Sequence, residues 1–368
     1  MALPHRAIAP LALALLVALP GCLSGPGAST WAYRMVQLDQ LDGGGAGVTV
    51  AILDTGINVR HPSLDHLVDG DRQNGELIAY RDFLDGGQGV GEARDPDGHG
   101  SHVAGILAAR GGGGVGDRLV SGDVELLGGA PAVRLVVARV CNAETCPGQA
   151  IVAGIRWATA QGADVLSLSL GGQAGLPPVL AEIVEDQMTD AINDAIDRGV
   201  VVVASAGNCG NAAREGCQGA DDVNTPAAIS GVIAVGAVDS KGRVASFSSG
   251  GDNAGNPCRP LPLAGLSGRC DPNKKPELVA PGVDIVGAWT GRTYVTVSGT
   301  SQATPFVTAA VAHMLAGRPD LNDRDDVLAV KRALVDTAKP VTGQDRPHDA
   351  EAGYGILQAR SAVDRYRR

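Results

Sequence analysis

The sequence predicts a three-layer α/β fold in which a mainly parallel β-sheet is covered by helices on both faces. Apolar runs of strand length alternate with segments of helical periodicity, and no internal repeat or long linker interrupts them. The runs are almost wholly apolar, which is typical of parallel strands buried on both faces. With 368 residues, 44% of them hydrophobic, the chain is long enough to bury a large core as one domain.

The expected strands are the apolar runs 48–53, 135–140, 165–170, 200–204 and 232–238. The expected helices are 101–110, 149–161, 180–197, 301–315 and 325–337, and a hairpin is expected around 292–297. Gly162 follows the second of these helices, where a glycine commonly ends a helix in a left-handed conformation. Because loops at the carboxyl ends of parallel strands carry the chemistry of such sheets, the polar residues that follow the strands are the functional candidates.

The net charge of −10 argues against a nucleic-acid-binding protein, which would present a basic face. The first 22 residues predict an export signal, because a slightly basic start precedes an apolar run, 7–19, that is too short to span a bilayer. We therefore expect a signal peptide at 1–22, a short N-terminal segment at 23–45 and the folded domain at 46–368.

Cys22 ends the signal in the sequence Leu19-Pro20-Gly21-Cys22, which resembles the lipobox of bacterial lipoproteins, whose cysteine is lipidated. Pro20 is unusual in that motif, and the alternative is an ordinary signal peptide with an incidental cysteine. In either case we expect an exported protein, which is periplasmic, anchored to the cell envelope or extracellular. A lipid on Cys22 would be its only membrane contact.

The other six of the seven cysteines fall into three close pairs, as short-loop disulfides of an exported protein would. The spacing does not favour zinc, because neither Cys-x-x-Cys nor nearby histidines are present. The expected pairs are Cys141/Cys146, Cys209/Cys217 and Cys258/Cys270.

Four polar residues stand where strands end or helices begin. Asp54 and Asn208 follow apolar strands, His99 lies between two glycines before a helical pattern, and Ser301 lies where another helix begins. Each has an ordinary alternative as a cap, a turn former or, for His99 with His102, a metal pair. A helix N-terminus also suits a nucleophilic Ser, because its N–H groups and dipole favour negative charge. The Asn amide is likewise a possible donor to an oxyanion.

Together these segments resemble the subtilases, the subtilisin-like serine peptidases, for which the order Asp, His, Ser is typical. The resemblance extends from about residue 31 to 363. Its other matching segments are 51–56, 165–171, 206–208, 232–238, 275–282 and 353–359. It implies the subtilisin-like fold and a secreted serine endopeptidase.

The resemblance also implies a role for each residue. Ser301 attacks the scissile carbonyl to form an acyl-enzyme, His99 takes and later returns the proton, and Asp54 holds the imidazole. Asn208 donates to the oxyanion. The residues implied to bind substrate are Ser169, Leu170, Gly171, Ala206, Gly207 and Asn224. We expect a monomer that acts on proteins or peptides and needs no cofactor for its chemistry. Structural calcium is frequent in subtilases, but no residues here can be assigned to it.

Some features depart from the family pattern. Gln302 follows the nucleophile where the family commonly has Met, 111–128 is long and Gly-rich, and an insertion between Ser249 and Lys274 holds Cys258 and Cys270. Fewer than about 25 residues separate the signal from the domain, which leaves no room for the folding propeptide of many secreted subtilases.

Two other functions fit the sequence less well. A catalytically inactive subtilase-fold surface protein would have lost a triad residue, and all three are present. A nucleotide binder is excluded because the Gly run 43–47 precedes a strand and neither it nor 111–114 is followed by Gly-Lys-Ser/Thr. A Cys209–Cys217 bridge, next to Asn208, is expected to hold the oxyanion donor in place; alternatively, it only tethers a surface loop.

Overall fold

The structure is a computed structural model of the chain. It describes residues 30–68, 76–111, 126–171, 178–210, 223, 225–251, 274–317, 321–345 and 347–368, with only the backbone for 178–181.

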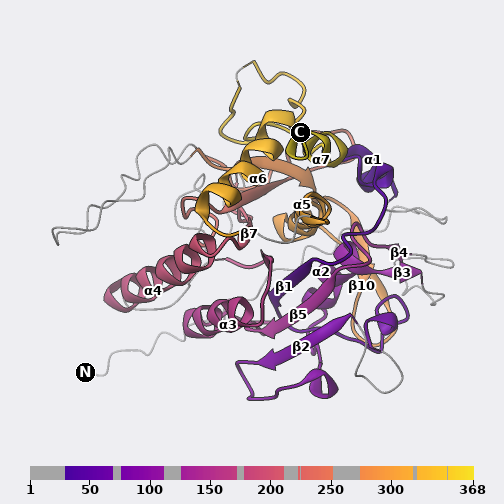
Figure 1. Cartoon of the computed structure of the whole chain (residues 1–368), viewed down its shortest axis with the longest axis vertical. Helices are drawn as coiled ribbons and strands as arrows, with labels where there is room; N and C mark the ends of the chain where they lie inside the picture. The colour runs from indigo at the N-terminus through magenta and orange to yellow at the C-terminus, as the bar shows by residue number, and fades with distance from the viewer. Residues whose placement is uncertain are drawn as a thin grey trace, which may run out of the picture.

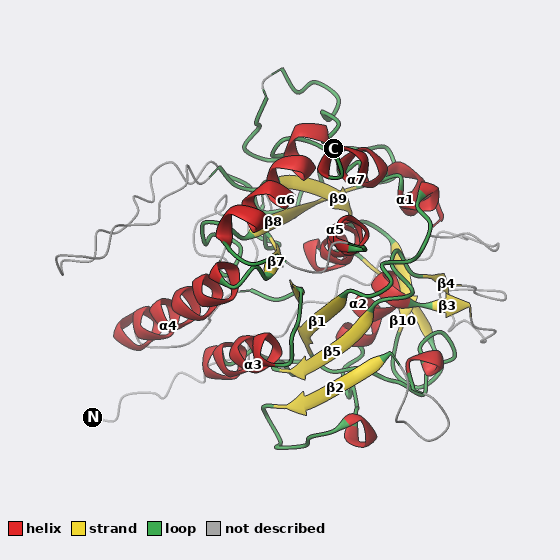
Figure 2. Cartoon of the chain, in the orientation of Figure 1, coloured by secondary structure: helices red, strands yellow, loops and turns green. Residues whose placement is uncertain are grey.

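A seven-stranded sheet lies at the centre of the molecule, with strand order β2-β5-β1-β6-β7-β8-β9 and all neighbouring strands parallel (Figure 2). The strands are β1 (Thr49–Asp54), β2 (Leu77–Asp82), β5 (Arg134–Arg139), β6 (Val165–Leu168), β7 (Val201–Ser205), β8 (Ile233–Val238) and β9 (Leu278–Pro281). Every residue of β1, β6, β7 and β8 is buried, as expected for strands covered on both faces. The predicted fold class is therefore confirmed.

Helices cover both faces of the sheet. α2 (His99–Ala108) and α5 (Thr300–Leu315) pack against each other on one face, and α3 (Gly148–Ala160) and α4 (Pro178–Asp197) pack against each other on the other face (Figure 1). The left-handed conformation of Gly162, with φ of 78°, ends α3 as predicted. α5 packs on four strands, β6 to β9, and its first residues are hydrogen-bonded to residues that follow β6 and β7.

The two ends of the described chain lie side by side. α7 (Ala359–Tyr366) packs on α5 and on α6 (Arg324–Thr337), and the N–H of Ala359 donates to the carbonyl of Val36, just after α1 (Thr30–Met35). Within the described residues, no helix combines the length and the apolar character that crossing a bilayer requires.

Several elements differ from the prediction. The edge strands β2 and β9 were not expected, because β2 alternates between buried and exposed residues and β9 ends in Pro281. The hairpin consists of β10 (Ile285–Ala288) and β11 (Tyr294–Val297), so the prediction included only its turn and second strand. A second short hairpin pairs β3 (Arg110–Gly111) with β4 (Leu126–Leu127).

Candidate active site

Asp54 and His99 form a buried, hydrogen-bonded pair at the carboxyl edge of the sheet. Asp54 is the last residue of the central strand β1, and His99 is the first residue of α2. The Nδ1 atom of His99 lies 2.7 Å from Oδ1 of Asp54, and the residues are 9% and 1% exposed. The N–H of Thr55 also donates to this carboxylate oxygen, at 2.7 Å. The carboxylate therefore holds the imidazole by Nδ1.

The carboxylates around His99 favour its protonated form. Burial lowers the pKa of His99, but the charge and hydrogen bond of Asp54, followed by the charges of Asp97 and Asp95, outweigh it and raise the pKa to about 9. Asp97 also accepts a hydrogen bond from the backbone N–H of His99, at 3.1 Å. The site is thus built to stabilise an imidazolium ion.

Two glycines let the strand end and the helix start approach closely. A Cβ atom at Gly100 would collide with the carbonyl oxygen of Gly56, whose own φ is +124°. A hydrogen bond joins the two segments at this close approach, because the N–H of Gly100 donates to Oγ1 of Thr55 at 2.9 Å. Glycine at these positions is therefore required to place His99 beside Asp54.

Asp95 is a structural anchor that the sequence interpretation missed. It is 8% exposed. Its Oδ1 accepts from Thr55 Oγ1 and from the N–H groups of Asp97 and Gly98, and its Oδ2 accepts from the N–H and hydroxyl of Ser101. It therefore ties the end of β1 to the first turn of α2. A possible clue was the carboxylate pair of the Asp-Pro-Asp sequence directly before Gly98.

Ser301 is the second residue of α5 and is held by Ser169, which follows β6. The hydroxyl of Ser301 donates to the carbonyl of Ser169 at 3.1 Å, and the hydroxyl of Ser169 donates to the carbonyl of Ser301 at 2.9 Å. Since β6 is the neighbour of β1, this places Ser301 at the same sheet edge as Asp54. Among the described residues, the hydroxyl of Ser301 is bonded to Ser169 and not to His99.

Asn208 presents its amide NH₂ group next to Ser301. Its Oδ1 accepts from the N–H of Thr300 at 2.9 Å and from the Thr300 hydroxyl at 3.0 Å. A backbone N–H can only donate, so these contacts fix which side of the amide faces Thr300. A methyl group built on Gly299 would lie 2.7 Å from Oε1 of Gln302, 3.6 Å from Asn208 Nδ2 and 3.7 Å from the N atom of Ser301. The Asn208 amide and the backbone N–H of Ser301 are therefore close neighbours at Gly299, with the Gln302 side chain beside them.

The other predicted substrate residues lie in the loops after β6 and β7. The carbonyl of Leu170 accepts from the Ser205 hydroxyl, and the N–H of Ala206 donates to Val235. The N–H of Gly207 donates to Oγ1 of Thr300, and a Cβ on Gly171 would lie 3.7 Å from the Thr225 carbonyl. Asn224 lies outside the described residues.

One predicted disulfide is present, between Cys141 and Cys146. Cys209 is also disulfide-bonded, and its N–H donates to the Ser249 hydroxyl at 2.9 Å. The other cysteines lie outside the described residues: Cys22, Cys217, Cys258 and Cys270.

No acidic cluster suited to calcium occurs in the described part of the chain. No three His, Cys, Asp or Glu side chains there are grouped to hold a metal. The acidic side chains Asp82 and Asp85 instead bind Arg94 and Arg139, with contacts of 2.7–2.8 Å.

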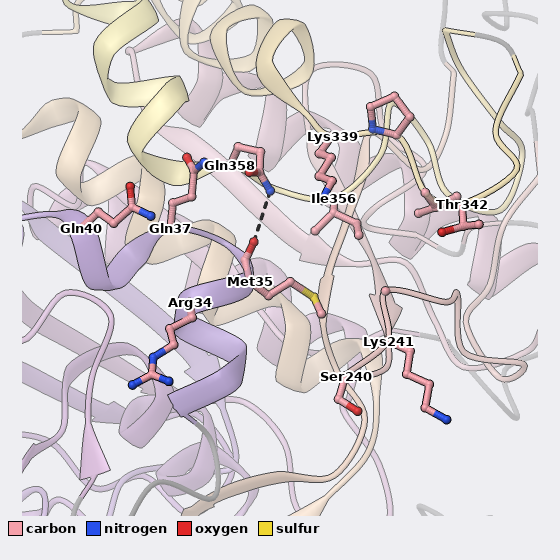
Figure 3. A pocket seen from close by; sticks show the side chains of 13 residues that line it. Arg34, Met35, Gln37, Gln40, Ser240, Lys241, Lys339, Thr342, Ile356 and Gln358 are labelled. Atoms are coloured by element: carbon pink, nitrogen blue, oxygen red, sulfur yellow. Dashed lines mark hydrogen bonds between the residues drawn. The ribbon is translucent and has the colours of Figure 1, made fainter.

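A pocket of about 440 Å³ lies away from these residues, between α1 and the segments 240–242, 339–342 and 356–358 (Figure 3). The side chain of Gln358 crosses its wall and donates to the Met35 carbonyl at 3.2 Å. Arg34 and Lys241 at its rim point away from each other, so their charges do not converge on one ligand position. None of the predicted site residues lines this pocket.

Known proteins of one family are similar to this chain over most of its length. The model of the subtilase family matches residues 45–355. Subtilisin DY of Bacillus licheniformis is 34% identical over 279 residues, which are 76% of this chain and 80% of that protein. Subtilisin BL of Lederbergia lenta is 33% identical over 320 residues (87% and 91%), and Thermitase of Thermoactinomyces vulgaris is 32% identical over 302 residues (81% and 84%). The chain therefore belongs to the subtilase family and is a serine endopeptidase.

Proposed function

We propose that the protein is an exported endopeptidase that cleaves protein or peptide substrates with Ser301, His99 and Asp54 as its catalytic triad. The observation that carries this proposal is the buried 2.7 Å contact between His99 Nδ1 and Asp54, at the sheet edge where α5 begins with Ser301. This contact leaves Nε2 of His99 as the ring nitrogen that can exchange a proton with the nucleophile.

The chemistry follows from these positions. The hydroxyl of Ser301 leaves the Ser169 carbonyl and turns to Nε2 of neutral His99, which takes its proton as Oγ attacks the scissile carbonyl. The resulting imidazolium is stabilised by Asp54, and it gives the proton to the leaving amine. Water, activated by the same nitrogen, then hydrolyses the acyl-enzyme. No metal is needed in these steps, so we expect a chelator to leave the chemical step unaffected.

Asn208 Nδ2 and the N–H of Ser301 are the proposed oxyanion donors. Their closeness at Gly299, where α5 begins, supports this role, because oxyanion donors must lie together beside the attacking hydroxyl. The substrate backbone would run beside Ser169–Gly171 as an added strand. The loop 206–207, with Asn224, would form the pocket for the side chain before the scissile bond.

All the proposed catalytic groups come from one chain, so a monomer is sufficient. The family match from residue 45 supports a catalytic domain that begins near residue 46. We propose export by the segment 1–22 and lipidation of Cys22. Inhibition of lipoprotein signal peptidase should then leave a precursor, and Cys22→Ser should release the protein from membranes. Normal processing with a soluble wild type would indicate plain secretion instead.

The test of the catalytic proposal is covalent labelling. A peptidyl phosphonate should label Ser301 at one site, and Ser301→Ala should lose both labelling and hydrolysis. Full activity of a cleanly purified Ser301→Ala protein would refute the triad. A folded wild type that neither reacts nor hydrolyses peptides would instead support an inactive surface protein.

A further inference from the structure

Three kinds of link hold the short loop between β5 and α3: a disulfide, side-chain hydrogen bonds and a backbone hydrogen bond. The disulfide Cys141–Cys146 joins its ends. Inside it, the side-chain oxygen of Asn142 accepts from the N–H groups of Glu144 and Thr145, both at 2.9 Å, and the N–H of Asn142 donates to the Thr145 carbonyl at 3.0 Å. The covalent bridge and these bonds together leave the loop little freedom.

This loop holds the backbone of Asp54. The carbonyl oxygen of Asp54 accepts from the N–H of Val140 at 2.9 Å and from the N–H of Cys141 at 3.2 Å. The carboxylate of the same residue binds His99. A short path therefore leads from the disulfide to the imidazole: from the bridge to Cys141, from its N–H to Asp54, and from the Asp54 carboxylate to His99.

The bridge also links the end of β5 to the start of α3. Cys146 lies two residues before α3, and a Cβ at Gly154 of that helix would lie 2.7 Å from a methyl group of Val140 and 3.2 Å from one of Leu53. α3 therefore packs closely on the residues that flank Asp54. Without the bridge, Cys141 would lose its covalent link to the start of α3 and would be held there by its chain neighbours and non-covalent contacts.

We propose that the Cys141–Cys146 disulfide is a positioning element for the Asp54–His99 pair, and that the peptidase becomes fully active only when this bridge forms. The proposal rests on the catalytic triad proposed above. The bridge forms when one cysteine thiolate attacks an external disulfide and releases one external thiolate, and the second cysteine then attacks the mixed disulfide and displaces the other. Two protein thiols are thereby oxidised, the external disulfide is reduced to two thiols, and the two protons of the protein thiols pass to them.

The consequence is activation that depends on the compartment. Disulfides persist after export and are rare in the reducing cytoplasm, so the enzyme would be slow where it is made and fast where it is delivered. Because displacement of a catalytic group by about 1 Å can cost on the order of 10²-fold in rate, loss of the bridge should lower kcat by about 10- to 100-fold. KM should change little, because the bridge acts through Asp54 and not through the substrate loops.

The test compares Cys141→Ser/Cys146→Ser with Glu144→Ala, which changes an exposed side chain of the same loop and keeps the bridge. Phosphonate titration counts folded active sites, so partial unfolding cannot imitate a lower kcat. We expect the double variant to lose kcat and to show a lower apparent pKa for the acidic limb of kcat/KM. Glu144→Ala should match wild type. Reduction is not used as the test, because it would also break the disulfide at Cys209, next to Asn208.

Wild-type kcat in the double variant would overturn the proposal. So would a lower kcat with an unchanged acidic limb, because that pattern would indicate general loosening and not displacement of Asp54. Asp54→Asn distinguishes this failure from failure of the triad itself: an active Asp54→Asn enzyme would refute the triad, whatever the bridge does.

Discussion

Asp97→Asn should shift the acidic limb of the pH–rate profile to lower pH. Asp97 raises the pKa of His99 by its charge, and its Oδ1 accepts the N–H of His99. Asparagine keeps this acceptor and removes only the charge. The substitution therefore tests the electrostatics around the proposed base without removing the hydrogen bond that holds the start of α2.

The expected size follows from the balance around His99. The net rise of its pKa from 6.5 to about 9 corresponds to about 3 kcal/mol in favour of the imidazolium. Asp54 contributes more than Asp97, so loss of the Asp97 charge should remove the smaller part of this, and a fall of about 0.5 in the pKa would correspond to about 0.7 kcal/mol. The neutral, active fraction of His99 at pH 7 would then rise about 3-fold, and kcat/KM with it. At pH values well above the pKa of His99, wild type and Asp97→Asn should have the same kcat/KM.

The assay is kcat/KM for one peptide substrate across the neutral and alkaline range, with Glu144→Gln as a control for the same charge change at an exposed site. An acidic limb that stays at its wild-type position in Asp97→Asn would refute this account of the electrostatics. An acidic limb near 6.5 in the wild type would show that the carboxylates do not raise the pKa of His99 at all.

The same pKa makes a prediction for stability. The folded-state pKa of about 9 exceeds the unfolded value of 6.5, so protonated His99 contributes about 3 kcal/mol to the free energy of unfolding below pH 6.5. This contribution is lost as the pH rises through 9. Lys275 acts in the opposite sense, because burial lowers its pKa to about 7. To isolate the contribution of His99, the free energy of unfolding in urea is compared between Ser301→Ala and Ser301→Ala/His99→Ala. The difference between the two variants should shrink between about pH 6 and about pH 10.

Three further substitutions test the surrounding structure. Asn208→Ala should lower kcat by about 10²–10³-fold with little change in KM, a magnitude that comes from subtilisin itself; a wild-type kcat would exclude Asn208 as the oxyanion donor. Gly100→Ala should prevent the close contact with Gly56, so differential scanning calorimetry should show a lower Tm and peptide hydrolysis should be lost. Glu277→Gln should cost about 3–5 kcal/mol in urea unfolding, because Glu277 is the carboxylate that pairs with the buried Lys275, at 2.9 Å; an unchanged unfolding midpoint would contradict this pairing.

The central strands of the sheet could be predicted from the sequence, but its edge strands could not. β1, β6, β7 and β8 are covered on both faces, so burial leaves a continuous apolar run that periodicity detects. Among the described residues, β2 has a single neighbouring strand, and it keeps exposed positions, so its apolar pattern is diluted. The predicted strand ends also located Asp54, because residues that end adjacent parallel strands share one edge.

The supporting contacts of the site could not be predicted in the same way. Thr300 orients Asn208 across 92 positions of sequence, and Ser169 holds Ser301 across 132. Such pairs depend on the order of the strands and on how α5 crosses the sheet. No local sequence pattern at Thr300 or Ser169 predicts which distant residue it contacts. Ser169 was expected to bind substrate, which stays a prediction; the structure adds that its hydroxyl donates to the backbone carbonyl of Ser301.

The hydrogen bond between Ser301 and the Ser169 carbonyl is consistent with the raised pKa of His99. Below about pH 9 the imidazole carries protons on both nitrogens and offers Ser301 no acceptor, so the hydroxyl needs another one. The Ser169 carbonyl, at 3.1 Å, provides it. Deprotonation of His99 creates a competing acceptor at Nε2, and exchange of one neutral hydrogen bond for another costs little, about 1 kcal/mol or less. One proton on His99 would therefore control both the base and the direction of the nucleophile's hydroxyl.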